Sequence, residues 1–204
     1  EILLPQYGWV GVGRDDGKDG GEFSPIFYRK DRFTVLDSGT SWLSDTPEVT
    51  GSKSWDAAIT RIANWVILFD LQSNQEFLHL NTHFDHRGEA ARTNSAALIV
   101  ARLKNLARGR PVLVSGDFNV PPTAPAYDTM TSALDDSYIK TATAPHGPVG
   151  TFGGFEVGST ANELRIDYVF VDSTFQVLRY AALSYQWDGS YPSDHLPVLV
   201  ELSW

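Results

Sequence analysis

The chain of 204 residues contains no cysteine, which excludes a disulfide framework and any thiolate metal site. No apolar run approaches the roughly 18 residues that a membrane-spanning helix needs. Basic residues are few, with 16 Lys and Arg against 25 Asp and Glu and a net charge of -9. Proteins bind long nucleic acids largely by neutralising the phosphates with Lys and Arg side chains. This balance therefore disfavours a long polynucleotide as the partner.

No signal peptide opens the sequence, although a chain that starts at Glu1 rather than Met is expected to have been processed or cropped. The hydrophobic content is 42%, and aromatic residues make up 12% of the chain. These values suit one sizeable core, and the length is that of an ordinary domain. Residues 1–204 are therefore expected to form a single domain.

Short strand-like runs alternate with Gly, Pro, Asp and Ser along most of the chain. One segment differs, because apolar residues recur every three or four positions between Gly88 and Arg108, which predicts a helix. A short helix is expected at 126–133. Strands are predicted at 7–13, 22–28, 32–37, 39–43, 61–69, 76–82, 110–115, 165–171, 175–182 and 197–202. This pattern predicts an α+β fold in which two mixed β-sheets pack face to face as a sandwich, with helices on the outside.

Four polar clusters stand at the ends of apolar runs, where a packed core would have no use for them. Burying one unpaired polar group costs roughly 1 to 3 kcal/mol, so such groups are expected to gather at one open edge. Because they are His, Asp and Asn side chains, they predict a metal-assisted phosphate site. The clusters are Asn81-Thr82-His83-Phe84-Asp85, Ser115-Gly116-Asp117-Phe118-Asn119, Arg165-Ile166-Asp167-Tyr168 and Ser193-Asp194-His195.

Asp117 and Asn119 lie two residues apart, so in extended chain they point the same way. A carboxylate beside an amide can hold a metal-bound water and a phosphate oxygen together. The alternative is an ordinary turn after a strand, where Gly, Asp and Asn are common. His83 can donate to a phosphate oxygen or move a proton near neutral pH. Alternatively, His83 is simply a polar residue at the end of a strand, without a role in catalysis.

Asp194 and His195 offer a metal ligand beside a general base, and Asp167 is a candidate for the carboxylate that orients that base. Arg14 and Arg61 are candidate phosphate contacts because a guanidinium group binds phosphate in a bidentate way. A surface ion pair is the commoner role of an arginine. Two roles therefore stay open for Arg14 and Arg61: contact with the substrate phosphate, or an ion pair on the surface.

The four clusters, in this order, resemble the motifs of the endonuclease/exonuclease/phosphatase superfamily. Its members include pancreatic deoxyribonuclease, apurinic endonucleases, deadenylases and inositol-polyphosphate phosphatases. The resemblance runs from about Tyr7 to the C-terminus. Segments 11–17, 21–28 and 42–47 further resemble a bacterial branch of the superfamily. Many members of that branch are exported, which slightly favours a periplasmic or extracellular location.

The resemblance implies a deoxyribonuclease I-like fold and a role for each motif residue. His195 resembles the general base that activates water, and Asp167 the carboxylate that orients it. Asp117 and Asn119 resemble the pair that positions the nucleophile and the scissile phosphate. His83 resembles the second histidine, which contacts the phosphate.

Asp194 resembles a carboxylate at the metal site. The implied cofactor is Mg²⁺, with Mn²⁺ or Ca²⁺ as possible substitutes, since Mg²⁺ takes oxygen ligands and keeps several waters. The family pattern begins with an Asn-bearing strand, a helix and a Gln-Glu strand end. Here Tyr7 to Gly11 already resembles the family segment that lies after those elements. The resemblance therefore implies an N-terminally incomplete domain that lacks the first strand and helix.

The function expected from the sequence is metal-dependent hydrolysis of a phosphoester bond, by a phosphodiesterase or a phosphatase. The expected partner is a phosphorylated small molecule or a phosphodiester. One alternative is a deoxyribonuclease-like endonuclease or exonuclease, which the acidic charge disfavours. Another is a degenerate, non-catalytic binding module on the same scaffold, without the principal metal ligand.

Overall fold

A mixed sheet of six strands forms the centre of the computed structural model, which describes residues 5–158 and 164–204. Its strand order is β3-β4-β5-β6-β8-β7, and only β5 and β6 run parallel among the pairs described. A parallel pair needs a long crossover, and helix α1 (Glu89–Ala107) provides it. The six strands are β3 (Phe33–Trp42), β4 (Ile62–Asp70), β5 (Gln75–His83), β6 (Val112–Asp117), β7 (Asp135–Asp136) and β8 (Asp167–Val171).

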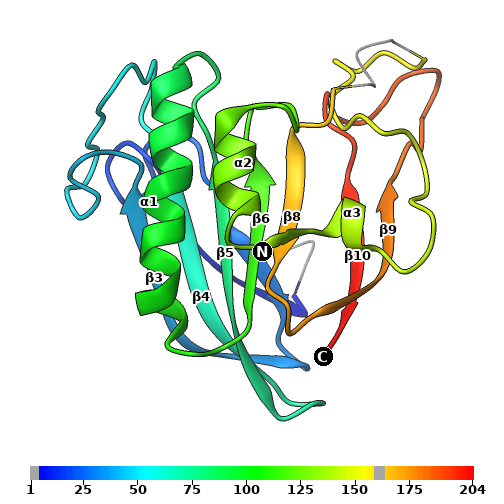
Figure 1. The fold of residues 1–204 in the computed structure, drawn as a ribbon, viewed down its shortest axis with the longest axis horizontal. Coiled ribbons are helices and arrows are strands. Elements are labelled where there is room, and N and C mark those ends of the chain that lie inside the picture. The colour runs from blue at the N-terminus through cyan, green and yellow to red at the C-terminus, as the bar shows by residue number, and fades with distance from the viewer. Residues whose placement is uncertain (1–4, 159–163) are drawn as a thin grey trace.

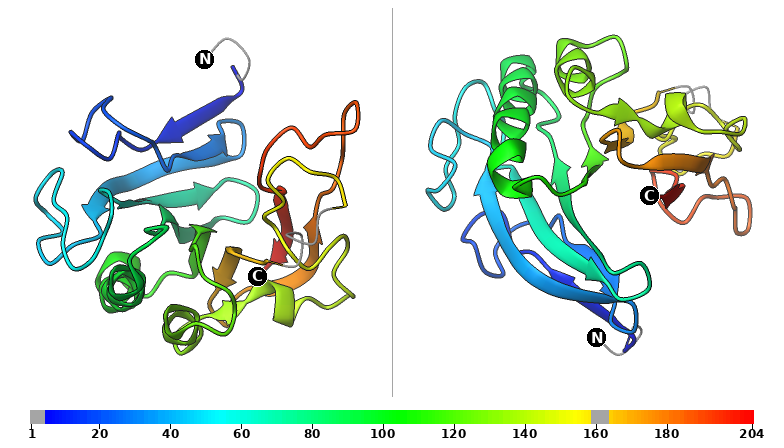
Figure 2. Two further views of the ribbon diagram at one scale, coloured as in Figure 1. Left: turned by 90° about the horizontal axis from the view of Figure 1, so that it is seen from above. Right: turned by 60° about the horizontal axis from the view of Figure 1, so that its bottom comes forward.

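Two antiparallel pairs lie on the side of this sheet away from the long helix (Figure 2). They are β1 (Tyr7–Val10) with β2 (Ile26–Arg29), and β9 (Gln176–Ala182) with β10 (Val198–Ser203). Helix α2 (Pro125–Thr131) lies beside α1, and the short α3 (Ser137–Lys140) lies between α2 and β9 in the view of Figure 1. The predicted α+β sandwich with outer helices is confirmed.

Strand β4 has buried side chains on both faces, which explains its nearly unbroken hydrophobic run. Ala63 and Ile67 belong to the core under the helices, which is completed by residues such as Ile99 of α1. Val66 and Leu68 belong to a second, smaller core, which also includes Ile26 of β2 and Phe77 of β5. The central sheet is thus covered on both faces.

The predicted helix over 88–108 forms from Glu89 to Ala107, and its first turn is held by the Asp56 carboxylate, which accepts from the N–H groups of Ala90 and Ala91. The two strands predicted at 32–37 and 39–43 are one strand, β3. Its pairing with β4 shifts between Val35 and Asp37, so a β-bulge takes up the irregularity without ending the strand. In the ranges that the structure describes, no helix is long and apolar enough to cross a membrane.

Candidate active site

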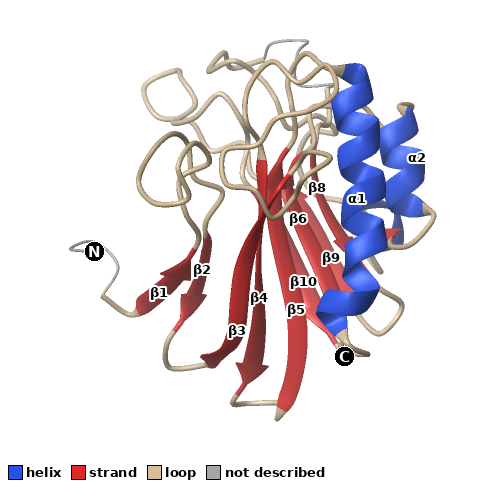
Figure 3. Cartoon of the chain, turned by 90° about the vertical axis from the view of Figure 1, so that its left-hand side faces the viewer, coloured by secondary structure: helices blue, strands red, loops and turns tan. Residues whose placement is uncertain are grey.

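Strands β5 and β6 end, and β8 begins, on the side of the sheet where the loops gather (Figure 3). One row of side chains crosses these three neighbouring strands at that end. His83 of β5 is the register partner of Asp117 on β6, and Asp117 is the register partner of Asp167 on β8. Directly opposed residues point to the same face of a sheet, so the three side chains share one surface. The His83 Nε2 atom lies 3.1 Å from Asp117 Oδ2. The pairing register therefore brings three of the predicted residues together.

His195 joins this row from the loop before β10. Its Nδ1 atom lies 2.7 Å from Asp167 Oδ2. A carboxylate at this distance selects the tautomer with hydrogen on Nδ1 and leaves the lone pair on Nε2. The Nε2 atom lies 3.9 Å from Asp117 Oδ2. The hydrogen bond to Asp167 raises the pKa of His195 above its ordinary value near 6.5, although partial burial opposes this shift.

Asn119 fixes the Asp117 carboxylate from the turn after β6. Its backbone N–H donates to Asp117 Oδ1 at 2.8 Å, and its side-chain Nδ2 donates to Asp117 Oδ2 at 3.2 Å and to the Phe84 carbonyl at 3.1 Å. The residue has φ +50°, a left-handed conformation that Asn adopts more readily than most residues. Gly-Asp-Phe-Asn is thus both a turn after a strand and part of the site. The turn places the Asn119 side chain against the Asp117 carboxylate of the row.

Gly116 permits the close approach of β5 and β6 beside the site. It has φ +148°, and a Cβ atom here would overlap the carbonyl oxygen of Thr82. Any larger residue would push the strand that presents Asp117 away from the strand that presents His83. The glycine in the Ser-Gly-Asp motif is therefore a geometric requirement of the site.

Thr151 positions Asp167, and no local pattern signals this role, since the residue is a lone threonine in a Gly-rich loop. Its fully buried hydroxyl accepts from the N–H groups of Ile166 and Asp167, each at 3.1 Å. The next residue, Phe152, packs edge-on against the His195 ring with centroids 5.1 Å apart. The loop at 151–152 therefore supports both members of the His–Asp pair.

Arg165, which precedes Asp167 in its motif, anchors β8 in the protein interior. It is 3% exposed and pairs with the equally buried Asp136 at 2.8 Å. Its guanidinium also lies over the rings of Tyr138 and Tyr168, 4.6 and 4.5 Å from their centroids. Within the described structure Arg165 thus holds the start of the strand that presents Asp167.

Glu22 links the two predicted phosphate-binding arginines to the row. One carboxylate oxygen lies 3.1 Å from His83 Nδ1, and the other accepts from Arg14 Nη1 at 2.5 Å and lies 3.8 Å from Arg61 Nη1. Arg61 is 5% exposed, and its Nε and Nη1 atoms have no hydrogen-bond partner within residues 5–158 and 164–204. Burial lowers the pKa of Arg61, and the nearby Arg14 charge lowers it further. Both arginines lie at the edge of the site, where Arg14 forms an ion pair.

Among the residues that the structure describes, Asp117, Asp167 and His195 form a group that could hold a metal ion, since one ligand atom from each lies within 4.8 Å of the others. Asp194, the predicted metal ligand, is not brought into this group. Its carboxylate accepts a 3.4 Å hydrogen bond from Ser193, and its carbonyl accepts from two backbone N–H groups of the loop at 153–154. Carboxylate oxygens are the donors that a hard divalent cation prefers, so the residues present fit such an ion.

Two neighbouring polar residues have separate roles. Asp85 is buried and accepts from four backbone N–H groups, so it ties the loop at 58–59 to the start of α1. His86 is exposed, with Nδ1 3.5 Å from Arg61 Nη2.

An open cavity of about 450 Å³ borders the row and is lined by His83, Asp117, Asp167 and His195 among others. This volume is in the range of small-molecule sites.

A two-layered α+β sandwich with His, Asp and Asn side chains at one sheet end places the chain in the deoxyribonuclease I-like class of folds. The model of the endonuclease/exonuclease/phosphatase family matches residues 4–195, and the chain belongs to this family. Members of the family are phosphoester hydrolases and generally use a divalent metal.

Solved bacterial structures are similar over nearly the whole chain. A family protein from Bacteroides thetaiotaomicron is 43% identical, with a TM-score of 0.94 over 98% of this chain and 76% of that one. A mannosyl-6-phosphatase from the same species is 43% identical, with a TM-score of 0.93 over 100% of this chain and 79% of that one. A curated relative, an uncharacterised protein of Acanthamoeba polyphaga mimivirus, is 25% identical over 86% of this chain and 68% of that protein.

Proposed function

We propose that this protein is a metal-dependent phosphoester hydrolase in which His195 and Asp167 activate the attacking water. The observation that supports this most strongly is the 2.7 Å contact between His195 Nδ1 and Asp167 Oδ2, beside a row of His83 and Asp117. A base needs a free lone pair, a fixed orientation and a nearby substrate group. His195 has its Nε2 lone pair directed toward the row and its other nitrogen held by a carboxylate.

The geometry suggests a separate role for each residue of the site. His195 removes a proton from water through Nε2, and Asp167 stabilises the imidazolium that forms. Asp117 orients the water, since its carboxylate lies 3.9 Å from His195 Nε2. Asn119 and His83 flank Asp117 and bind oxygens of the phosphate.

The charges of the site support a role for a cation in phosphate binding. Asp117 and Asp167 face the same surface, and like charges at such range repel a phosphate group strongly. We infer that Asp117 and Asp194, the metal ligand predicted from the sequence, would hold Mg²⁺, so that the Nε2 atom of His195 stays free for the water. When bound, this ion supplies neutralisation of the phosphate charge and stabilisation of the leaving oxygen.

The substrate we propose is a small phosphorylated molecule with a phosphomonoester group. The 43% identity with a mannosyl-6-phosphatase supports a monoester over a diester. The net charge of -9 disfavours a long nucleic acid. The cavity of about 450 Å³ suits a substrate of modest size.

The test is a screen of the purified chain with Mg²⁺ against p-nitrophenyl phosphate, sugar phosphates, bis-p-nitrophenyl phosphate and supercoiled plasmid. We expect phosphate release from the monoesters and its loss when EDTA removes the metal. Nicking of the plasmid at a higher kcat/KM would assign a nuclease instead. A chain that binds Mg²⁺ and phosphate without any turnover would be a binding module, which would overturn the proposal.

A further inference from the structure

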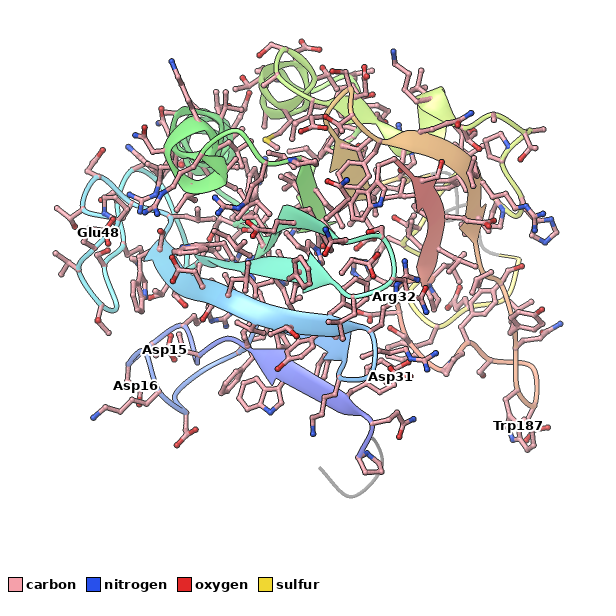
Figure 4. The ribbon with its side chains drawn as sticks, turned by 90° about the horizontal axis from the view of Figure 1, so that it is seen from below. Asp15, Asp16, Asp31, Arg32, Glu48 and Trp187 are labelled. Carbon is pink, nitrogen blue, oxygen red and sulfur yellow. The ribbon has the colours of Figure 1, made fainter. Side chains whose placement is uncertain are left out.

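Two aromatic side chains stand almost fully in water on the loop that leads from β9 to the active site. Tyr185 is 80% exposed and Trp187 is 84% exposed. Figure 4 shows Trp187 on a loop that projects from the body of the molecule. Aromatic groups of this size usually bury much of their surface, and exposed apolar groups that gather on one surface commonly mark an interaction site.

A tight turn holds Trp187 in place. The Trp187 N–H donates to the Ser190 carbonyl at 2.9 Å, and the Ser190 N–H donates back at 3.1 Å. The two central residues, Asp188 and Gly189, have φ of +50° and +77°. Positive φ at both positions and an Asp-Gly sequence are typical of a type I′ turn, one of the commonest tight hairpin connections. Trp187 is therefore presented by a defined backbone.

A short ladder of isolated β-bridges and backbone hydrogen bonds leads from Trp187 toward the catalytic residues. Ser190 pairs with Glu156, the Tyr191 N–H donates to the Phe155 carbonyl, and Phe152 pairs with His195. Ser190 and His195 are five positions apart, a span of at most ~17 Å at the rise of an extended chain. The exposed aromatic pair and the hydrolytic centre are thus two ends of one structural unit.

Chemically distinct side chains share the face of this ladder that presents Trp187. Trp187 lies directly opposite Ser190, and Ser190 directly opposite Glu156. Tyr185 lies two residues before Trp187 on the same loop, and both side chains are exposed there. This loop surface therefore combines two aromatic rings with a hydroxyl and a carboxylate. A sugar ring needs this combination, because its C–H face packs on an aromatic ring and its hydroxyls form hydrogen bonds with polar groups.

The charge of the surrounding loops distinguishes a sugar from other ligands with flat or apolar faces. Residues 141–158 and 183–194 contain no Lys or Arg, and Glu156 and Asp188 are acidic. A nucleic acid backbone or an anionic lipid surface would be repelled here. A neutral, polyhydroxylated partner is compatible with this charge.

We propose that the surface formed by Tyr185, Trp187, Ser190 and Glu156 binds the sugar part of the substrate, so that the hydrolysed phosphate is borne by an oligosaccharide. This assignment rests on the proposed phosphoester hydrolase activity. The phosphorylated unit lies at His195, and neighbouring neutral sugar units extend along the ladder to Trp187.

Binding tests the surface independently of turnover. The probe is neutral mannotriose, titrated while the intrinsic tryptophan fluorescence and the ligand resonances in saturation-transfer NMR are recorded. We expect wild type to bind and Trp187→Ala to lose the signal, with Trp187→Tyr retaining most of it. Trp9→Ala is the matched control, because Trp9 is 46% exposed on β1 and packs against Phe23, and it should bind as wild type. Equal binding by wild type and Trp187→Ala, or no binding by either, would overturn the assignment.

Kinetics separates this inference from the proposed function. Against a 6-phosphorylated mannotriose, Trp187→Ala should raise KM about tenfold with little change in kcat, the effect of removing one well-packed aromatic contact. Against p-nitrophenyl phosphate the same variant should match wild type. Equal KM values for both enzymes on the oligosaccharide would refute the sugar surface and leave the hydrolase intact. Trp187-dependent sedimentation with phosphatidylcholine vesicles would assign a membrane and also overturn it.

Discussion

The Nδ1 atom of His195 lies 2.7 Å from the Oδ2 atom of Asp167, although the two residues are 28 positions apart in the chain. Asp167 is fixed by its register with Asp117 and by the Thr151 hydroxyl, which accepts from its N–H. The ring of His195 is fixed by this contact and by the edge of Phe152. The position of the proposed base is therefore set by a strand register and a loop.

Asp167→Asn should move the acid limb of the pH–rate profile to lower pH. In wild type the hydrogen bond with Asp167 raises the pKa of His195, so the base stays protonated, and inactive, to a pH above its ordinary pKa. Removing the carboxylate charge lowers that pKa toward its ordinary value, and the free base then appears at lower pH. The plateau should fall by about 10²-fold, since a neutral amide no longer stabilises the imidazolium that forms when His195 takes the proton. The measurement is kcat/KM across a pH range that spans both limbs of the profile. An acid limb that stays in place or moves upward would argue against the pair.

Gly116→Ala should reduce stability and activity together. The new Cβ would overlap the Thr82 carbonyl at a φ that L residues avoid, and the expected loss is about 2 to 4 kcal/mol in the free energy of unfolding. Urea denaturation measures this loss. Gly109→Ala is the matched control, since its φ is also positive but no atom lies within 4 Å of the added Cβ, and about 1 kcal/mol is expected there. Equal losses for the two variants would contradict the close-approach argument.

Glu22→Ala should lower kcat about tenfold, because His83 loses the acceptor that holds its Nδ1 atom and one charge-assisted hydrogen bond is worth this much. Glu22→Gln keeps a carbonyl oxygen for His83 and should retain most of the activity. Glu48→Ala breaks an ion pair with Arg102 and serves as the control, which should be silent. If Glu22→Ala behaves like Glu48→Ala, Glu22 is only a surface acid.

Asp136→Ala should destabilise the protein by about 3 to 5 kcal/mol, because it leaves the buried Arg165 charge without its carboxylate. Thermal and urea denaturation measure the effect. Glu201→Ala breaks the exposed pair with Arg179 and should change stability by less than about 1 kcal/mol. A small effect of Asp136→Ala would mean that Arg165 finds other partners.

Much of this arrangement could be predicted from the sequence, because the patterns that indicate it lie within short segments of the chain. Apolar residues at helical spacing predicted α1 within one residue at each end, and the clusters at the ends of apolar runs predicted His83, Asp117 and Asp167 at one edge. The alternation of the strands fixes which face each polar residue occupies. The row then follows once the order of the strands is known.

Other features depend on contacts between distant segments, which no local pattern reports. The buried Thr151 acts on Asp167 from 16 residues away, and Asp136 meets Arg165 from 29 residues away. The predicted ligand Asp194 shares its segment with His195, but the sequence could not show that its carbonyl binds the loop at 153–154 while the ion-binding group forms around Asp117. Its role at the metal stays a prediction.

The most direct test of the proposed mechanism is the rate of phosphate release by His195→Ala with saturating Mg²⁺, alongside its thermal midpoint. The side chain of His195 is partly exposed, so its removal should leave the midpoint nearly unchanged. The rate should fall by about 10²- to 10⁴-fold, the usual contribution of a positioned general base. Wild-type turnover by the purified, folded variant would contradict the assignment of His195 as the base.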